Sequence, residues 1–139
     1  MATEQTREAA RKVMERLDQR DLEGLLAQAA PDAKWHGFAP VTLDNNGYRQ
    51  AISEFLNGFP DSRFPIESVI AEGNKAAVRH SLRGTHNGIF QGIPPTGRQV
   101  IVNGVAEFQV EDGKIVETWL HADLLGMLTQ LGVVPTPDQ

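Results

Sequence analysis

The sequence predicts an α+β domain in which helices come first and an antiparallel meander of strands follows. Two observations support this fold class. Three segments within residues 3–59 repeat apolar side chains at helical spacing, whereas β-rich runs separated by glycine-bearing turns begin near residue 62. The last run leads directly into a short apolar helical segment, so we expect the helices to pack on one face of the sheet.

The composition is that of an ordinary soluble globular protein. The chain has 139 residues, of which 40% are hydrophobic and 22% are charged. We therefore expect a single domain over residues 1–139, with a core large enough to contain a cavity. The formal net charge of −5, without a basic stripe, argues against nucleic acid and anionic membranes as partners.

Two features that the sequence lacks limit the possible catalytic chemistry and the cellular location of the protein. The chain has no cysteine, which excludes disulfides, thiolate nucleophiles and zinc–thiolate sites. Residues 1–20 are polar and charged, with no hydrophobic run like that of a signal peptide or a membrane span. These features predict a cytoplasmic protein.

Helical periodicity predicts three helices before the strands. Within residues 3–19 the apolar positions share one face: Ala10, Val13, Met14 and Leu17. Asp21 is a suitable N-cap for a second helix, which carries apolar residues as far as Ala29 and ends at Pro31. After a short strand at residues 33–38, helical spacing returns over residues 45–59, with one stripe of Tyr48, Ile52, Phe55, Leu56 and Phe59.

Turn signals divide the remaining chain into strands. Gly73-Asn74 is typical of a turn between β-rich runs, and Asp112-Gly113 is a strong signal for a two-residue hairpin. A loop with several glycines and prolines occupies residues 87–97. The predicted strands are residues 63–73, 75–86, 98–110 and 114–122.

The chain closes with a helix and a short tail. Residues 123–132, "DLLGMLTQLG", have helical character, with Gly132 at the expected end. The tail over residues 133–139 contains two prolines and is expected to be frayed.

The hairpin turn sets which residues of the last two strands face each other. With Asp112 and Gly113 as the turn, small or aliphatic residues face larger polar or aromatic ones: Ala106 faces Trp119, Gly104 faces His121 and Val102 faces Asp123. A small residue opposite each large one leaves room, as the wall of a cavity requires. A β-bulge would break this register.

The opposite face of this hairpin is expected to meet a second subunit. By the predicted register it carries Ile101, Asn103, Val105, Glu107, Val116, Thr118 and Leu120. Apolar side chains are costly to expose on a sheet, so we predict a homodimer or higher homo-oligomer through this face.

His80 is in a similar position on an earlier strand, since it shares one face with Ala76, Val78 and Leu82. His80, His121 and Asp123 are therefore the candidate catalytic residues. For either histidine the alternative is a core side chain that is satisfied by a backbone carbonyl.

Several ordered motifs resemble a known family. "GTHNGIFQGIPPTGRQV", "EDGKIVETW" and "DLLGMLTQLG" follow one another as in the SnoaL-like polyketide cyclases (ester cyclases) of the NTF2-like superfamily. Upstream, "WHG" followed by "FLNGFPDSRFPIESVIAEGN" is similar to the same family, so the resemblance covers residues 32–135. The chain departs from the family pattern at "GTHNGIF", where Asn87 and Ile89 replace a hydroxyl residue and an acidic residue.

The resemblance implies a fold and an activity. The fold is a cone-shaped barrel, in which a curved antiparallel sheet wraps around a pocket that N-terminal helices close. The activity is intramolecular aldol ring closure without metal or cofactor, and the catalytic acid/base is the aspartate that begins the last helix, here Asp123. Groups related to the cyclases are associated with hydroxylation of polyketides.

Aldol ring closure needs a base that removes a proton from a carbon activated by neighbouring carbonyls. It also needs an acid that protonates the new alkoxide. One carboxyl does both if an apolar pocket raises its pKa towards neutrality, with His121 or His80 holding the proton or polarising a carbonyl. Asp123 also has a structural interpretation, because aspartate before "LLGMLTQL" is a favoured N-cap. A capping carboxylate has a lowered pKa, so the two roles shift the pKa in opposite directions.

Aromatic and polar side chains near the predicted pocket are expected to hold the ligand. A small hydrophobic or aromatic molecule would stack on several of them, and the candidate substrate-binding residues are Trp35, His36, Phe38, Tyr48, Phe90 and Trp119. A metal site built from His36, His80, His121 and Asp123 lacks a compact ligand spacing, so we expect neither metal nor cofactor.

The leading hypothesis is a cofactor-independent enzyme that cyclises a hydrophobic, polyketide-like carbonyl compound, with Asp123 as acid/base. The alternatives are a polyketide hydroxylase or hydratase with the same pocket, and a dimeric domain that binds a small molecule without catalysis. Fold alone does not choose among them.

Overall fold

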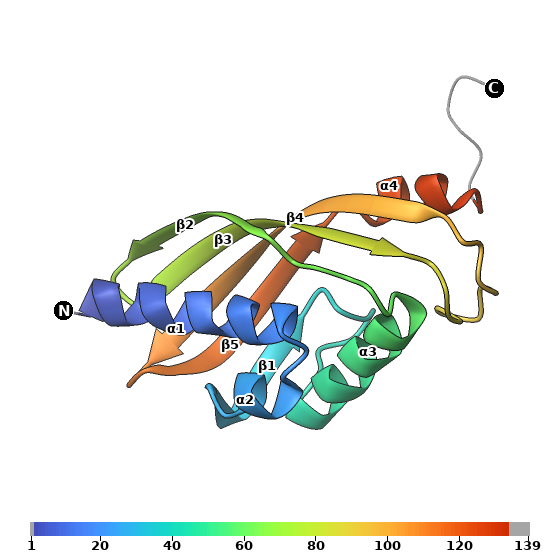
Figure 1. Ribbon diagram of the computed structural model, residues 1–139. Coiled ribbons are helices and arrows are strands. Elements are labelled where there is room, and N and C mark those ends of the chain that lie inside the picture. The colour runs from blue at the N-terminus through green and yellow to red at the C-terminus, as the bar shows by residue number, and fades with distance from the viewer. Residues whose placement is uncertain (1, 134–139) are drawn as a thin grey trace.

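A computed structural model describes residues 2–133 and shows the predicted α+β architecture (Figure 1). The helices are α1 (Ala2–Asp18), α2 (Leu22–Leu26), α3 (Asn45–Gly58) and α4 (Leu124–Leu131). The strands are β1 (Ala29–His36), β2 (Ile66–Glu72), β3 (Lys75–Thr85), β4 (Gln99–Glu111) and β5 (Lys114–Ala122). They form one curved, unclosed sheet in the order β1-β5-β4-β3-β2.

The helices before β2 cover one face of the sheet, because their apolar stripes need a partner surface. Figure 1 shows α1 lying across the strands, with α2 and α3 beyond its C-terminal end. The main core lies between this layer and the sheet, and it includes Ala10, Val13, Met14, Leu17, Trp35, Tyr48, Ile52, Val78, Ala106 and Phe108.

The second helix is shorter than its apolar pattern predicts. It ends at Leu26 instead of Ala29, and Ala29 already begins β1. Pro31 therefore lies inside a strand and does not terminate a helix. This position is tolerated because β1 is at the edge of the sheet, and its pairing with β5 is irregular between Ala29 and Lys34.

The antiparallel meander predicted for the strands after residue 62 is confirmed, and the strand before α3 adds one parallel pair. β2, β3, β4 and β5 form antiparallel pairs, but β1 runs parallel to β5. The chain leaves β1, passes through α3 and returns at the opposite edge as β2. A parallel pair needs a long crossover, and the three intervening strands with α3 supply it.

A β-bulge in the last hairpin overturns the predicted register. Asp112 and Gly113 have positive φ values of 52° and 77°, as a tight hairpin turn requires. Val110 still pairs with Ile115 as predicted, but Gln109 pairs with Glu117, so Val116 is an extra residue in β5. One extra residue moves every later side chain to the other face.

The predicted positions of Trp119 and His121 are therefore wrong. Trp119 pairs with Glu107 and His121 with Val105, not with Ala106 and Gly104. Both side chains therefore point away from the helices, while Thr118, Leu120 and Ala122 turn towards them. The faces predicted for β3 and β4 are correct: His80 pairs with Gly104 and Val78 with Ala106, all on the covered face.

The outer face of the sheet differs from its prediction in the same way. It carries Ile101, which is exposed, and the half-buried Val105 and Trp119, whereas Thr118 and Leu120 belong to the covered face. Assembly through this outer face stays a prediction.

A second cluster supports α4 and the loop that precedes β4. It consists of Phe59, Phe90, Val100, Val102, Met127 and Leu131. The side chain of Gln130 fixes α4 to β4, since its Nε2 donates to Ile101 O (2.9 Å) and its Oε1 accepts from Ile101 N (2.7 Å). The helix ends at Gly132, whose φ of 81° is left-handed.

Two further expectations concern the ends of the chain and the membrane. The tail predicted to be frayed lies, apart from Val133, outside the described residues. Within residues 2–133, no helix is long and apolar enough to cross a membrane.

The shifted register can be tested with single cysteines, because the chain contains none. Cysteine at position 121 (His121→Cys) should react with a thiol reagent as an exposed group, since His121 is exposed. Cysteine at position 118 (Thr118→Cys) should react at least about tenfold more slowly, because reaction at a buried site requires local opening. The unbulged register predicts the opposite order of rates.

Candidate active site

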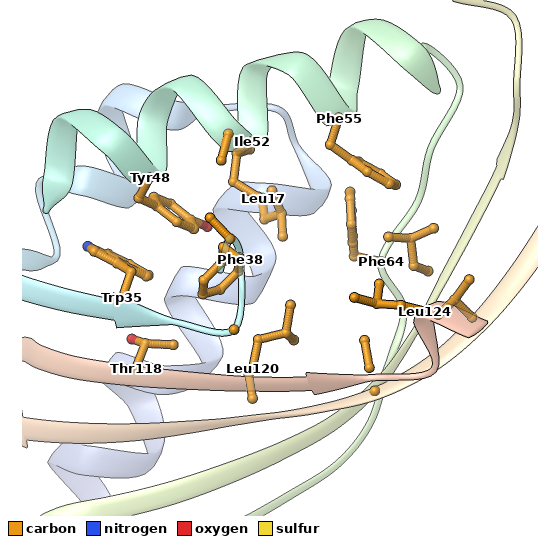
Figure 2. A pocket seen from close by; sticks show the side chains of 18 of the residues that line it. Leu17, Trp35, Phe38, Tyr48, Ile52, Phe55, Phe64, Thr118, Leu120 and Leu124 are labelled. Carbon is orange, nitrogen blue, oxygen red and sulfur yellow. The ribbon is translucent and has the colours of Figure 1, made fainter. Parts of the chain in front are cut away.

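A largely apolar pocket of about 290 Å³ lies between the helices and the covered face of the sheet. Its wall includes Leu17 of α1, Ile52 and Phe55 of α3 and Leu120 of β5 (Figure 2). Leu82 of β3 also lines it. Residues 37–40 and 90–91 complete it from two loops. Ligand pockets typically combine such an apolar lining with a few well-placed polar groups.

Three aromatic rings form a rigid wall at one end. Trp35 and Tyr48 stack with their ring centroids 3.8 Å apart and an interplanar angle of 12°. Phe38 meets Tyr48 edge-on at 5.0 Å. Trp35 Nε1 donates to Asn45 Oδ1 (2.8 Å), and Asn45 Nδ2 donates to Ala30 O (2.9 Å), so β1 and α3 hold the wall in place.

The pocket has a buried end and an open end. Trp35, Tyr48 and Thr118 are almost wholly buried and lie together at one side of Figure 2. At the other side are Phe55 and Leu124, of which Leu124 is 55% exposed. The Leu124 end of the pocket is therefore more exposed to solvent than the aromatic wall.

His80 is a buried titratable group in the lining of this space, which also includes Tyr48 and the exposed Glu54. It is 6% exposed, and its Nδ1 lies 3.3 Å from Val78 O. A carbonyl oxygen only accepts, so the hydrogen is assigned to Nδ1 and the lone pair to Nε2. A Cβ added to Gly104 would lie 3.4 Å from His80 Nε2, so the absent side chain leaves room at this nitrogen.

Burial lowers the pKa of His80 below its usual 6.5, because the apolar surroundings disfavour the imidazolium. The hydrogen bond to Val78 O and the charge of Glu67 raise the pKa, but the effect of burial is larger. The imidazole is therefore neutral at neutral pH, with a free lone pair on the ring nitrogen beside Gly104.

Two buried hydroxyls accompany His80 in the lining. Tyr48 is 2% exposed, and burial raises the pKa of its phenol, so the hydroxyl keeps its proton. Thr118 Oγ1 is buried and makes no hydrogen bond with the described residues. Sequence reasoning placed Thr118 on the outer face, because nothing in residues 114–117 signals the bulge.

The structure divides the predicted site residues between the two faces of the sheet. Trp35, Phe38, Tyr48, His80 and Phe90 line the pocket.

The remaining aromatic and histidine candidates lie on the outer face. His36 Nε2 is 2.6 Å from Glu117 Oε2, its Nδ1 is 3.1 Å from Thr42 Oγ1, and the Trp119 ring stacks on it at 5.5 Å. His121 is exposed on the same face. These three side chains are thus separated from His80 by the sheet.

Asp123 is at the rim and acts as the N-cap of α4. Its Oδ1 accepts from Gly126 N (2.8 Å), and the side chain is exposed. Its neighbours Ala122 and Leu124 line the pocket, but Asp123 itself is not among the lining residues.

The residues proposed for a metal site are also dispersed. His80 is in the pocket, His36 and His121 are on the outer face, and Asp123 is at the rim. Among residues 2–133, no three or more His, Asp or Glu side chains gather in a way that could hold a metal ion.

Sequence comparison gives the family. Residues 7–131 match the family described as SnoaL-like polyketide cyclase. The chain belongs to this family, as its motifs and its curved sheet with covering helices indicate. No protein of curated function matches the sequence.

Solved structures show the same fold. AclR from Streptomyces galilaeus, a proposed hydroxylase, is 26% identical with a TM-score of 0.88, over 96% of this chain and 89% of its own. IdmH from Streptomyces antibioticus, a proposed polyketide cyclase, is 33% identical with a TM-score of 0.81, over 92% and 99%. TsrD from Streptomyces laurentii is 25% identical with a TM-score of 0.84, over 96% and 99%.

The capping role of Asp123 is testable through stability. Asp123→Ala should lower the free energy of unfolding by about 1 kcal/mol, because Gly126 N loses its acceptor, whereas Asp123→Asn should cost much less. Urea denaturation measures both. Asp44→Ala is a matched control, since Asp44 caps α3 in the same way through Gly47 N (2.8 Å). Unchanged or increased stability of Asp123→Ala would contradict the capping role.

Proposed function

We propose that the protein is an enzyme of the polyketide cyclase type, which closes a ring in a hydrophobic carbonyl compound with His80 as the base. The observation that carries this proposal is the position of His80 Nε2, which has a free lone pair in an apolar pocket beside Gly104. Family membership supports the class of reaction, and the pocket supports a small hydrophobic or aromatic ligand.

The proposed reaction is an intramolecular aldol addition. His80 Nε2 takes a proton from a carbon next to a carbonyl, and the electron pair of the broken C–H bond forms an enolate. The enolate carbon attacks a second carbonyl of the same molecule, which forms the C–C bond and an alkoxide. The alkoxide takes the proton back from His80, so the base is regenerated and no cofactor enters the balance.

The size of the pocket limits what it encloses. A cavity of roughly 150 Å³ lined by apolar side chains accommodates benzene, and this pocket measures about 290 Å³. It therefore encloses about two fused rings, and a longer molecule would extend past Leu124 into solvent. The stacked wall of Trp35 and Tyr48 would bind the flat face of such a ligand.

The family resemblance assigns the acid/base role to Asp123, but the position of Asp123 favours His80 for proton abstraction. Its carboxylate would have to release Gly126 N and turn past the neighbouring Leu124 to reach a ligand. His80 needs no such movement, so we assign the proton abstraction to His80. Variants of the two residues separate these mechanisms.

Hydroxylation is a second candidate, favoured by the similarity to the proposed hydroxylase AclR. It differs in atom balance, because aldol addition leaves the elemental composition of the substrate unchanged, whereas hydroxylation adds an oxygen atom. Mass spectrometry of the product therefore decides between the two. A binding domain without catalysis would give no product at all.

Proton abstraction can be measured before the natural substrate is identified. The bicyclic ketone 1-tetralone in D₂O exchanges its hydrogens next to the carbonyl, which NMR follows directly. His80→Gln should slow the catalysed exchange by about 10²–10⁴-fold, the usual contribution of a general base. His121→Gln should leave the rate unchanged, because His121 is exposed on the outer face.

The pH profile adds a second readout. Only neutral His80 accepts a proton, and burial lowers its pKa, so exchange should persist below pH 6.5 and disappear as the pH falls through the lowered value. A wild-type rate in His80→Gln, together with a lost rate in Asp123→Asn, would replace His80 by Asp123 as the base.

A further inference from the structure

The Tyr48 hydroxyl is a polar group at the buried end of the pocket, and it has no role in the proton transfers assigned to His80. Its ring is fixed between Trp35, stacked at 3.8 Å, and Phe38, edge-on at 5.0 Å. Figure 2 shows the side chain pointing from α3 into the pocket, on the side of Phe38. Because the ring cannot swing out to solvent, the hydroxyl has to find its partner inside the pocket.

No described residue supplies that partner. The chain's hydrogen bonds at this end connect Trp35 with Asn45 and Asn45 with Ala30, and they bypass Tyr48. Desolvation alone perturbs the phenol, with no hydrogen bond among the causes. The Tyr48 side chain as a whole is 2% exposed, but its oxygen is not one of the fully buried unpaired atoms, so it is accessible from the pocket. A donor that opens into a ligand-sized space and has no protein partner is available to a ligand acceptor.

The groups that line the pocket indicate what this acceptor is. Tyr48 comes from the helical side and His80 from the sheet side, so the lining of one pocket offers both an O–H donor and an unprotonated nitrogen. A carbonyl group with a neighbouring C–H bond has the complementary chemistry. Its oxygen accepts from the hydroxyl, and its neighbouring carbon gives a proton to the imidazole.

We propose that Tyr48 donates a hydrogen bond to the carbonyl oxygen of the ligand at the buried end of the pocket and stabilises the enolate that forms there. The proposal has two halves. The enolate half rests on the proposed function, whereas the binding half, in which Tyr48 donates to a carbonyl oxygen, does not. As His80 takes the proton, the electron pair of the C–H bond moves into the new C=C bond and negative charge develops on the oxygen. The Tyr48 O–H bond is retained throughout, and its hydrogen bond strengthens because the acceptor becomes charged.

The binding half is tested with two probes of the same shape. One is 1-tetralone, and the other is 1-methylenetetralin, in which a CH₂ group replaces the carbonyl oxygen. Their dissociation constants are measured for the wild type and for Tyr48→Phe, which removes only the hydroxyl. The wild type should bind 1-tetralone more tightly, relative to 1-methylenetetralin, than Tyr48→Phe does. We expect this relative preference for the ketone to fall by about tenfold in Tyr48→Phe, the equivalent of one hydrogen bond.

Thr129→Val is the control for binding. Thr129 Oγ1 donates to Leu125 O on α4, away from the pocket lining, so the same loss of a hydroxyl there should leave the ratio unchanged. An equal ratio in wild type and Tyr48→Phe would overturn the carbonyl subsite, and so would a wild type that binds neither probe.

Stability gives a readout that does not depend on any ligand. Replacing a hydrogen-bonded buried tyrosine by phenylalanine usually lowers the melting temperature. Replacing one whose hydroxyl is unpaired should leave it unchanged or raise it. A clear loss of stability in ligand-free Tyr48→Phe would show an internal partner for the hydroxyl and would overturn the proposal.

Exchange kinetics test the enolate half and separate it from the proposed function. Tyr48→Phe should lower kcat for hydrogen exchange of 1-tetralone by about 10²–10³-fold, the usual effect of removing one donor to a developing oxyanion. A merely structural role would instead raise KM and leave kcat unchanged. If exchange is absent in the wild type but the binding ratio shifts, the subsite stands and the cyclase function fails. If exchange depends on His80 but not on Tyr48, the enolate role fails and the cyclase function stands.

Discussion

The hydrogen bond between His80 Nδ1–H and Val78 O determines what the pocket can do. Because the partner is a carbonyl oxygen two residues back on β3, it fixes the neutral tautomer in which Nε2 carries the lone pair. The apolar lining disfavours protonation of that nitrogen, and Gly104 on β4 leaves space in front of it. A side chain at position 104 would fill this space, and a polar lining would let the imidazole charge. The proposed chemistry therefore depends on the surroundings of His80 as much as on the residue.

The position of His80 depends in turn on the regular pairing of β3 with β4, and this part of the fold could be predicted. The alternation of β3 and β4 and the Asp112-Gly113 turn are local features of the sequence, and the structure has the predicted faces for both strands. Asp123 before α4 and Gly132 after it are local signals of the same kind, and both act as caps.

The face of β5 could not be predicted because one extra residue decides it. Val116 is β-branched and apolar, as a regular strand residue would be, and its neighbours contain no glycine that would mark a bulge. A shift of one residue exchanged Trp119 and His121 for Thr118 and Leu120 in the pocket wall. Pro31 is a similar case, since its meaning in β1 depends on an edge position that long-range topology creates. Local signals thus gave the elements, and long-range pairing determined which side chains share a site.

The apolar walls and the few polar groups of the pocket have different functions. In the proposed function, Trp35, Phe38 and Tyr48 supply an aromatic surface for a ring system, which suits a fold that hosts several activities. Discrimination has to come from the polar groups, because a buried donor left without an acceptor penalises the wrong ligand more than an apolar contact rewards the right one. AclR and IdmH, described with different activities, share this fold with the chain, so the polar groups in the pocket are the features to compare among them.

The most direct test is the tautomer and titration of His80, measured by ¹⁵N NMR on histidine-labelled protein with His80→Gln for assignment. Our account predicts that at pH 7 His80 carries its proton on Nδ1, that Nε2 is unprotonated, and that the pKa lies below 6.5. A proton on Nε2 at pH 7, or a pKa above 6.5, would contradict it, because the nitrogen that faces the pocket would then have no lone pair with which to accept a proton.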